Sequence, residues 1–231
     1  MVSISVVTPV YNSEKIIEEF YFNLIKSLKK THQTFEIILV NDCSTDGSKK
    51  IIQKIKRKNT RLINLKKNIG QHNALLKGLK EAKGNTIITL DSDMQDDPDY
   101  IKKNYFKHIK SKKIQMISLK KDKNLRNIFS LIFWNLLGIF FFKFIHTNPS
   151  NYLFFSRKDL YDLLKMKKKF LIYLDFLIIK KEITIINGIK LSRKDKKTSY
   201  NFKKLFILSL RLLFHYNYFN KFQYLERKSK I

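Results

Sequence analysis

Residues 85–98, NTIITLDSDMQDDP, join an apolar run to a dense cluster of acids. The apolar run has the length and composition of a buried strand, and the acids follow it directly. Two earlier runs, at 4–10 and 35–42, are similar strand patterns with polar segments after them. Segments with apolar residues at helical spacing separate these runs. Strands that alternate with helices pair in parallel, so the sequence predicts an α/β fold with a mainly parallel sheet.

The rest of the N-terminal part continues this alternation. We expect a further strand at 60–67 and helices at 13–30, 44–58 and 70–84. Parallel sheets bind ligands beyond the carboxyl ends of their strands. The polar segments that follow the strands are therefore expected to meet at one edge of the sheet.

The overall charge of the chain is strongly positive. Of 231 residues, 47 are Lys or Arg and 19 are Asp or Glu, which gives a formal net charge of +28. This excess suggests an anionic partner, such as a nucleic acid, a phosphate-rich ligand or a membrane surface. A solvated, lysine-rich surface is the alternative explanation for part of it. The single cysteine, Cys43, excludes an internal disulfide framework and fits a reducing compartment. Met1 leads straight into a strand pattern, so we expect no secretory signal.

Two segments of the second half, 127–146 and 202–219, are largely apolar and carry basic residues within or beside them. A membrane-spanning helix needs about 20 consecutive, largely apolar residues, and polar side chains interrupt both segments. Amphipathic helices that lie in the membrane interface fit this pattern better. A wholly buried core helix is the alternative for the first segment.

Asp91 and Asp93 stand two positions apart directly after the apolar run. On an extended segment alternate side chains point the same way, so both carboxylates can face one cation. Gln95 follows at the same spacing and adds a neutral oxygen. Such a set suits Mg²⁺ or Mn²⁺, which prefer oxygen ligands. A short acidic cluster in a surface loop is the alternative interpretation.

A family resemblance is carried by four stretches: SVVTPVYNSE (5–14), EIILVNDCSTDGS (36–48), NIGQHNALLKGLKEAKGNTIITLDSDMQDDP (68–98) and SRKDKKTSY (192–200). Together they resemble the family 2 glycosyltransferases with a GT-A fold. The likeness is greater to the branch that makes polyprenyl-phosphate sugars, namely the dolichol-phosphate mannose synthases and the bacterial undecaprenyl-phosphate glycosyltransferases. It is strong over residues 3–100 and loose over 118–210.

The resemblance implies a GT-A (Rossmann-like) fold, with a mixed, mainly parallel sheet flanked by helices and C-terminal amphipathic helices at the membrane interface. Residues 1–120 would form the nucleotide-sugar-binding core. Residues 121–231 would form the acceptor-binding and membrane-interface part of the same domain.

The resemblance also implies roles for residues near the donor. Pro9, Tyr11 and Glu14 match the first nucleotide-binding loop, where Tyr11 would pack against the base. Asp42 matches the aspartate that reads the edge of the base. Asp91 would contact the nucleotide sugar and help to organise the metal.

Further matching positions concern the metal and the acceptor. Asp93 and Gln95 would join Asp91 in binding the Mg²⁺ or Mn²⁺ that bridges the diphosphate. Arg126 and Ser130 resemble an Arg-x-x-x-Ser motif that receives the lipid phosphate, and Arg193 resembles the arginine of a second basic motif. The catalytic residues implied are therefore Asp93, Arg126 and Arg193, with Arg126, Ser130 and Arg193 binding the acceptor phosphate.

Two departures from the family pattern stand out. Asn151 occupies a position where relatives often have an acid, and residues 193–200 match their motif only approximately. If these positions matter, the protein is impaired or uses a different sugar. A catalytically inactive scaffold is one alternative that follows.

The activity that the resemblance implies is metal-dependent, inverting transfer of a sugar from a nucleotide diphosphate sugar to a polyprenyl (undecaprenyl) phosphate. UDP-sugars are favoured over GDP-sugars as donors. We expect peripheral attachment to the cytoplasmic face of the cell membrane, aided by a homo-oligomer or a membrane-protein partner, and no nucleic-acid partner.

Two other functions remain as alternatives. A family 2 transferase acting on a saccharide hydroxyl, as in cell-surface polysaccharide synthesis, would need a carboxylate base after residue 100 and opposite the acidic pair. A nucleic-acid-binding protein would need basic stripes with exposed aromatic residues between them. The aromatic residues instead concentrate in the apolar segments.

Overall fold

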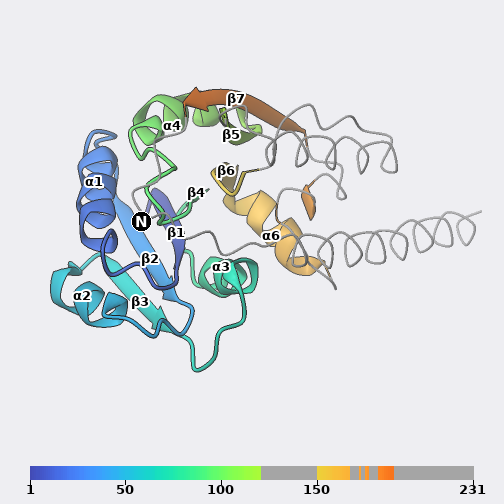
Figure 1. Cartoon of the computed structure of the whole chain (residues 1–231). Helices are drawn as coiled ribbons and strands as arrows, with labels where there is room; N and C mark the ends of the chain where they lie inside the picture. The colour runs from blue at the N-terminus through green and yellow to red at the C-terminus, as the bar shows by residue number, and fades with distance from the viewer. Residues whose placement is uncertain (121–149, 167–171, 173–174, 177–181, 190–231) are drawn as a thin grey trace, which may run out of the picture. The chain divides into compact units, whose positions relative to one another are not determined.

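The computed structural model of this chain describes residues 1–120, 150–166, 172, 175–176 and 182–189 (Figure 1). The chain divides into two compact units, Met1–Lys194 and Asp195–Ile231, and all described residues belong to the first. The two apolar segments at 127–146 and 202–219 lie outside the described residues. No helix among the described residues is long and apolar enough to cross a membrane.

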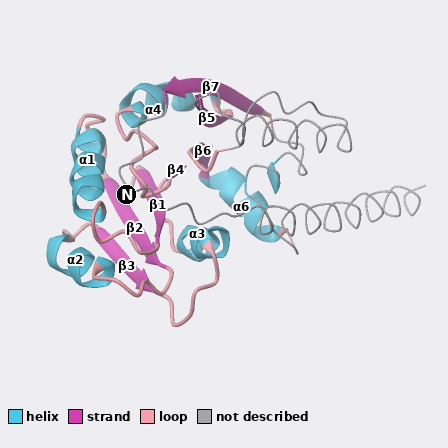
Figure 2. Ribbon diagram, viewed as in Figure 1, coloured by secondary structure: helices cyan, strands magenta, loops and turns pink. Residues whose placement is uncertain are grey.

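Seven strands form one sheet in the order β3-β2-β1-β4-β6-β5-β7 (Figure 2). The strands are β1 (Ile4–Val10), β2 (Phe35–Asn41), β3 (Thr60–Asn64), β4 (Thr86–Thr89), β5 (Ile114–Lys120), β6 (Leu153–Ser156) and β7 (Ile183–Ile189). The helices are α1 (Ile17–Lys29), α2 (Ser48–Ile55), α3 (Gln71–Lys80), α4 (Tyr100–Ser111) and α6 (Arg157–Lys165). The predicted mixed, mainly parallel α/β sheet flanked by helices is confirmed.

Strand direction decides where the connecting loops lie. Strand β1 pairs in parallel with β2 and β4, and β2 pairs in parallel with β3. Strand β6 runs antiparallel to both β4 and β5, and β5 pairs in parallel with β7. All strands except β6 therefore end at the same edge of the sheet, and β6 begins there. We call this the carboxyl edge; it contains the strand ends Val10, Asn41, Asn64, Thr89, Lys120 and Ile189.

Helices cover both faces of the central strands, which explains why β1 is buried along its whole length. On one face, Val6 and Leu39 join a core cluster with Phe20 and Leu24 of the amphipathic helix α1. On the other face α3 lies very close to the sheet at Gly78. A Cβ atom at this position would stand 2.4 Å from Val7 Cγ1. The absence of a side chain at Gly78 is thus what lets α3 pack against β1 and β2.

Buried polar contacts close the opposite edge, where the parallel strands begin. The Ser5 hydroxyl donates to Glu36 Oε1 at 2.6 Å, and Arg61 Nη2 lies 3.0 Å from Glu36 Oε2. Arg157 Nη2 donates to the carbonyl oxygen of Gly84 at 2.8 Å and so ties α6 to the start of β4. We call this edge of the sheet the amino edge. Its hydrogen bonds and ion pair give partners to polar groups that would otherwise be costly to bury.

Candidate functional site

The loops after β1 (residues 11–14) and β2 (residues 43–48) are bound to each other at the carboxyl edge. Their hydrogen bonds are Asn12 N to Ser44 Oγ (3.0 Å), Thr45 N to Asn12 Oδ1 (2.8 Å), Ser13 N to Ser48 Oγ (2.8 Å), Glu14 N to Asp46 Oδ2 (3.0 Å) and Gly47 N to Glu14 Oε2 (2.5 Å). Burial acts to raise the pKa of Asp46, but hydrogen bonds from Ser48 and Glu14 lower this pKa below its usual value. The two loops therefore act as one unit; we call it the interlocked loops.

The residues predicted for the first nucleotide-binding loop take different positions in this unit. Tyr11 is 46% exposed, so its ring is accessible to a ligand. Pro9 lies within β1, and its carbonyl oxygen accepts a hydrogen bond from Ser92 Oγ at 3.1 Å. The carboxylate of Glu14 accepts from Gly47 N, which gives it a structural contact between the loops. Of the three, Tyr11 has the clearest freedom to meet a base.

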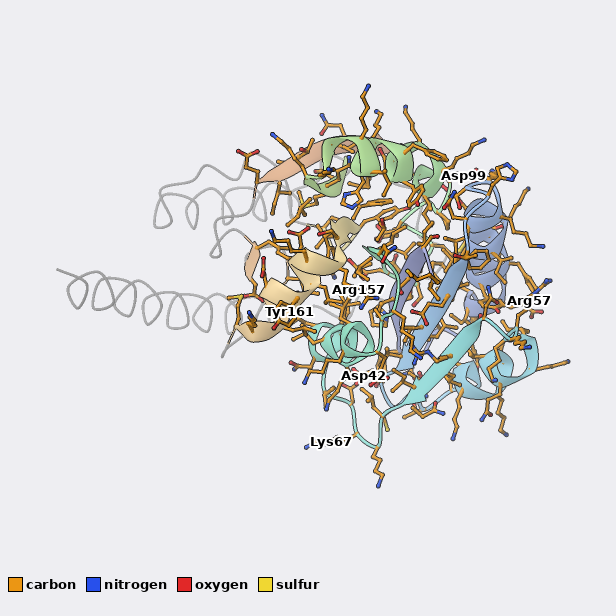
Figure 3. All side chains as sticks on the ribbon, turned by 180° about the vertical axis from the view of Figure 1, so that it is seen from behind. Asp42, Arg57, Lys67, Asp99, Arg157 and Tyr161 are labelled. Atoms are coloured by element: carbon orange, nitrogen blue, oxygen red, sulfur yellow. The ribbon has the colours of Figure 1, made fainter. Side chains whose placement is uncertain are left out.

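Asp42 lies at the end of β2 with 2% of its surface exposed. Its carboxylate accepts backbone hydrogen bonds from Ile69 N at 2.8 Å and Gly70 N at 2.9 Å, beside the start of α3 (Figure 3). Gly70 has a φ of +87°, a conformation that favours glycine. Asp42 thus fixes the turn that leads into α3, a contact the sequence did not suggest. A carboxylate has lone pairs beyond these two bonds, so reading a base edge is compatible with this geometry.

His72, in the first turn of α3, is a candidate that sequence reasoning missed. Neither of its ring nitrogens has a hydrogen-bond partner in the described part of the chain, and both are buried. Burial lowers the pKa of His72 from 6.5 to about 4. The imidazole is therefore neutral at pH 7. Its place in the motif GQHNALL, two residues after the turn held by Asp42, was the available signal.

The acidic segment after β4, residues 91–97, forms a loop held by its own backbone contacts. Asp91 N donates to Asp96 Oδ2 at 2.9 Å, and Gln95 N donates to Asp93 Oδ1 at 3.0 Å. Met94 adopts a φ of +62° between them. Burial alternates along the segment: the residues that are partly accessible are Asp91, Asp93, Gln95 and Asp97, and the buried ones are Ser92, Met94 and Asp96. The oxygen groups predicted to bind the metal are thus the accessible ones. We call this segment the acidic loop.

Asn151 lies directly beside the acidic loop. The antiparallel pairing of Thr89 with Leu153 brings the end of β4 next to the start of β6. The Asn151 side-chain amide stands 3.4 Å from Asp91 Oδ1, and the Asn151 carbonyl oxygen accepts from Thr89 Oγ1 at 2.5 Å. The position that departs from the family pattern is therefore part of the candidate site, and it presents a neutral amide to Asp91.

The predicted acceptor residues Arg126, Ser130 and Arg193 lie outside the described residues. The strands that precede them are described, however. Arg126 follows the end of β5 at Lys120 by six positions, and Arg193 follows the end of β7 at Ile189 by four. Both strands end at the carboxyl edge, the same edge as the interlocked loops and the acidic loop.

No group of three or more His, Cys, Asp or Glu side chains within the described ranges is arranged to hold a metal ion. The predicted set has a different composition, because it combines the two carboxylates of Asp91 and Asp93 with the amide oxygen of Gln95. Whether these residues act as ligands stays a prediction.

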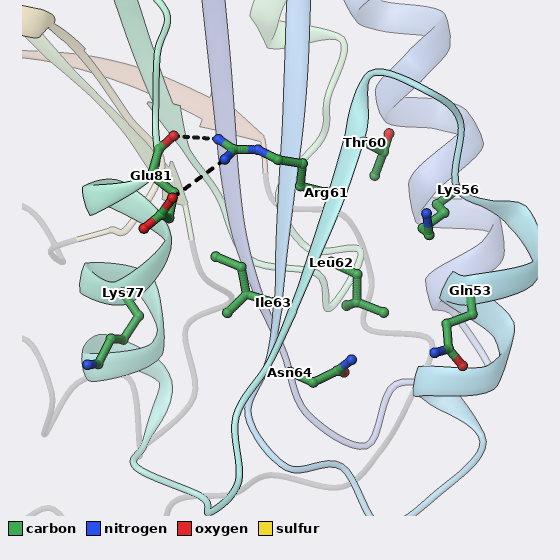
Figure 4. A pocket seen from close by; sticks show the side chains of 9 residues that line it. All are labelled: Gln53, Lys56, Thr60, Arg61, Leu62, Ile63, Asn64, Lys77 and Glu81. Atoms are coloured by element: carbon green, nitrogen blue, oxygen red, sulfur yellow. Dashed lines mark hydrogen bonds and ion pairs between the residues drawn. The ribbon is translucent and has the colours of Figure 1, made fainter.

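A separate pocket of about 550 Å³ lies along β3 between α2 and α3 (Figure 4). Arg61 crosses it to reach Glu81, with Nη1 at 3.5 Å from Oε2. The pocket is lined by Gln53, Lys56, Thr60, Arg61, Leu62, Ile63, Asn64, Lys77 and Glu81. None of the residues predicted for the site lines it, so the candidate site is defined by the chemistry of the carboxyl edge and not by this pocket.

This fold and this edge of polar loops define an α/β protein whose ligand site lies beyond the carboxyl ends of its parallel strands. The sequence model of the family described as "Glycosyl transferase family 2" matches residues 5–164, and the chain belongs to this family. The undecaprenyl-phosphate 4-deoxy-4-formamido-L-arabinose transferase of Proteus mirabilis is 41% identical over 101 residues, which are 42% of this chain and 31% of that protein. The chain thus spans about a third of the length of the curated relatives it matches.

Solved structures agree with the fold at lower identity. One such structure is glucosyl-3-phosphoglycerate synthase from Mycobacterium tuberculosis in complex with Mn²⁺, UDP and phosphoglyceric acid. Its TM-score to this chain is 0.66 at 17% identity, and the match covers 92% of this chain and 76% of the synthase. A second is TarS 1–349 of S. aureus in complex with UDP-GlcNAc. Its TM-score is 0.59 at 22% identity, and the match covers 91% of this chain and 65% of the TarS chain. At these identities the likeness shows the fold alone.

Proposed function

We propose that this protein transfers a sugar from a nucleotide diphosphate sugar to a polyprenyl phosphate, with inversion at the anomeric carbon and with the help of a divalent metal ion. The observation that carries the proposal is the strand order. It gathers Asp42, the acidic loop and the strands leading to Arg126 and Arg193 at one edge. The likeness to a transferase that acts on undecaprenyl phosphate supports the choice of acceptor.

The donor half of the mechanism belongs to the loops after β1, β2 and β4. Tyr11 would stack on the base and Asp42 would accept from its edge. Asp91, Asp93 and Gln95 expose hard oxygen atoms at alternate positions, and this set fits Mg²⁺ or Mn²⁺. When bound, the metal would neutralise charge on the leaving nucleoside diphosphate. Asn151 Nδ2 donates toward Asp91 Oδ1 at 3.4 Å and so helps to orient this carboxylate.

The acceptor half needs positive charge and no strong base. A phosphate monoester is already anionic at neutral pH, so its oxygen can attack the anomeric carbon without losing a proton to a carboxylate. Two anions must approach each other, and this requires cationic groups. Arg126 and Arg193, which follow strands ending at the carboxyl edge, would hold the acceptor phosphate by bidentate hydrogen bonds, with Ser130 as a further donor. The neutral side chain of Asn151 beside Asp91 agrees with a reaction that needs no base at that position.

The finer features of the proposal follow from the acceptor. A polyprenyl chain stays in the bilayer, so we propose that the protein works peripherally at the cytoplasmic face of the cell membrane. UDP-sugars are the favoured donors over GDP-sugars. A homo-oligomer or a membrane-protein partner would assist attachment.

A transfer assay with membranes tests the proposal. Purified protein, membranes and Mg²⁺ or Mn²⁺ are incubated with a panel of radiolabelled UDP- and GDP-sugars, and the lipids are extracted. We expect label from one UDP-sugar in a lipid fraction that releases it in mild acid. Label in soluble or cell-surface saccharide instead would favour the hydroxyl-acceptor alternative. Failure of every sugar to enter either fraction would leave the inactive scaffold as the better description.

A further inference from the structure

Helix α4 has an outer surface of unusual composition. It packs its inner side, with Ile101, Tyr105 and His108, into the protein. The outer side carries a set of exposed lysines interrupted by two apolar side chains. We call this the α4 surface; its members are Lys102, Lys103, Phe106, Lys107, Ile109 and Lys110.

The apolar pair is what distinguishes this surface from an ordinary lysine-rich one. Phe106 is 50% exposed and Ile109 is 49% exposed, and they lie three positions apart on the helix. Residues at this spacing are neighbours on a helix surface, so the two side chains form one apolar spot. Lys102 and Lys110 each lie four positions from Phe106 and so border the same spot. Each side chain leaves about half of its surface in water, and a partner that covers this apolar area would gain the free energy of its burial.

Acidic side chains are absent from α4 itself, whose sequence is YIKKNYFKHIKS. Two exposed acids beyond its ends, Asp99 and Glu182, are each paired with a lysine. Asp99 lies 2.7 Å from Lys30, and Glu182 lies 2.7 Å from Lys113, the latter pair lowering the pKa of Glu182. The exposed charged side chains of α4 itself are therefore all lysines.

The other labelled helices of the described part of the chain, α1, α2, α3 and α6, lack this combination; α3, for example, exposes no large apolar side chain. Helix α1 has Glu18 and Glu19 in its first turn, and α6 contains two aspartates. Helix α2 has a basic outer side without acids, but it exposes no large apolar side chain. The α4 surface is therefore not a simple result of the high lysine content of the chain.

We propose that the α4 surface docks on an anionic lipid bilayer. Lysines on long flexible stems are attracted to the diffuse negative charge of lipid headgroups, while Phe106 and Ile109 enter the boundary between headgroups and acyl chains. The helix contains no arginine, the side chain that dominates recognition of nucleic-acid bases and phosphates. The inference rests on the proposed function only in that an enzyme acting on a lipid phosphate must reach a bilayer.

Sedimentation with lipid vesicles tests the charged part of the surface. The full chain is mixed at low salt with vesicles of phosphatidylcholine alone or of phosphatidylcholine with phosphatidylglycerol. The triple variant Lys103→Gln, Lys107→Gln, Lys110→Gln should bind the anionic vesicles on the order of 100-fold more weakly than the wild type. The matched control changes the same number of charges on α2, as Lys49→Gln, Lys50→Gln, Lys54→Gln, and should lose much less. Equal losses of vesicle affinity in the two variants would overturn the proposal. A wild type that does not bind anionic vesicles would also overturn it.

The apolar spot is tested by a second pair of variants. Phe106→Gln with Ile109→Gln should weaken vesicle binding on the order of 10-fold at unchanged charge, whereas Phe22→Gln, a 41% exposed residue of α1, should not. Phe106 also packs edge-on against Tyr105, with ring centroids 5.2 Å apart, so thermal melts must show that the variants stay folded.

A fluorescent label measures insertion without relying on affinity. In a Cys43→Ser background, an environment-sensitive dye on Phe106→Cys should shift to the blue on anionic vesicles. The same dye on Lys50→Cys should not shift. A shift at both positions or at neither would contradict docking through α4. A wild type that binds RNA but not vesicles, and loses RNA binding in the α4 triple variant, would also contradict it. Vesicle binding needs no sugar donor, so the transferase assay can fail while this inference stands, and the reverse also holds.

Discussion

The interlocked loops and the acidic loop lie at the same edge of one sheet, but they are built in opposite ways. In the interlocked loops, polar side chains of residues 11–14 and 43–48 form hydrogen bonds with each other's backbone, across about thirty positions of sequence. In residues 91–97, Asp93 and Asp96 instead accept from backbone amides of the same loop, two and five positions away, and Ser92 donates to the backbone of β1. The first arrangement links two strand ends into a rigid support. The second leaves alternate oxygen groups accessible, as a ligand site requires. Substitutions in the acidic loop should therefore act mainly on activity, and those in or next to the interlocked loops mainly on stability.

The largest effect expected is on activity, from Asp93→Ala. Loss of one metal-binding carboxylate should lower the rate of transfer by about 10³-fold, because several kcal/mol of charge stabilisation in the transition state are lost. Calorimetric titration with UDP and Mn²⁺ should show weakened metal-dependent binding, while the free energy of unfolding changes by less than about 1 kcal/mol.

Asp97→Ala is the matched control for this prediction. Asp97 belongs to the same loop and accepts a similar local hydrogen bond, from Asp99 N at 2.9 Å, but it is outside the predicted metal set. Nucleotide and Mn²⁺ binding that is unchanged in Asp93→Ala, or equally weakened in both variants, would refute the metal assignment.

The second effect in size concerns Asp42. Replacement by Ala leaves Ile69 N without its acceptor and Gly70 N with only the longer bond to Asn68 Oδ1 at 3.2 Å, and it should lower the free energy of unfolding by about 3 kcal/mol. Urea denaturation measures this change. Asp42→Asn keeps the shape and one acceptor oxygen, so it should cost less. If Asp42→Ala unfolds at the wild-type midpoint, Asp42 does not anchor this turn.

The third prediction is a pH dependence from His72. Its folded-state pKa of about 4 lies below the unfolded value of 6.5, so the unfolded state binds more protons between these values. The stabilising effect of the neutral imidazole is complete above pH 6.5 and is lost as the pH falls toward 4. From about pH 7.5 to about pH 5 the loss should be about 2 kcal/mol.

Variants separate this contribution from the other titrating groups. The change in unfolding free energy with pH should be smaller by this amount in His72→Gln than in the wild type. The control is His32→Asn, since His32 is exposed and its φ of +56° is tolerated by asparagine. Identical pH profiles for wild type and His72→Gln would show that His72 is not buried in the neutral form.

The smallest effect is expected for Glu14→Gln. Its carboxylate accepts from Gly47 N across the interlocked loops, and weakening this bond should cost about 1 kcal/mol of stability. Glu18→Gln, on the exposed side of α1, should cost only a few tenths. If Glu14→Gln instead weakens UDP binding strongly at unchanged stability, Glu14 contacts the nucleotide as the family resemblance implied.

The order of strands and helices in the N-terminal part was predictable because its signals are local. Apolar runs and helical periodicity place β1, β2 and β4 within a few residues of their observed bounds. The sequence YLFFSRKDLYDLL (152–164) also indicates a strand leading into a helix, which agrees with β6 and α6. The antiparallel insertion of β6 between β4 and β5 was not predictable, because its pairing with β4 joins segments more than sixty positions apart. Its consequence for the site, the contact between Asn151 and Asp91, was hidden for the same reason.

Within the candidate site, residue types were easier to predict than contacts. The alternation of accessible and buried positions from Asp91 to Asp97 was expected, although the structure produces it with a turned loop, in which Met94 has a φ of +62°, and not with an extended strand. The use of Asp42 to hold the 69–70 turn and the burial of His72 were not, because they depend on how α3 packs through Gly78. The type of a side chain, which the sequence gives, indicates what chemistry it can perform. Its hydrogen-bond partners and its burial depend on tertiary packing.

The contacts of the amino edge have a consequence for how this protein can change. Ser5, Glu36, Arg61 and the Arg157 bridge to Gly84 lie at the end of the sheet away from the acidic loop. Part of the stability of the fold therefore comes from residues remote from the acidic loop. A mutant library randomised at Gln95 and Asn151 should keep a high proportion of folded members, which makes these positions suitable starting points for evolving new donor preferences.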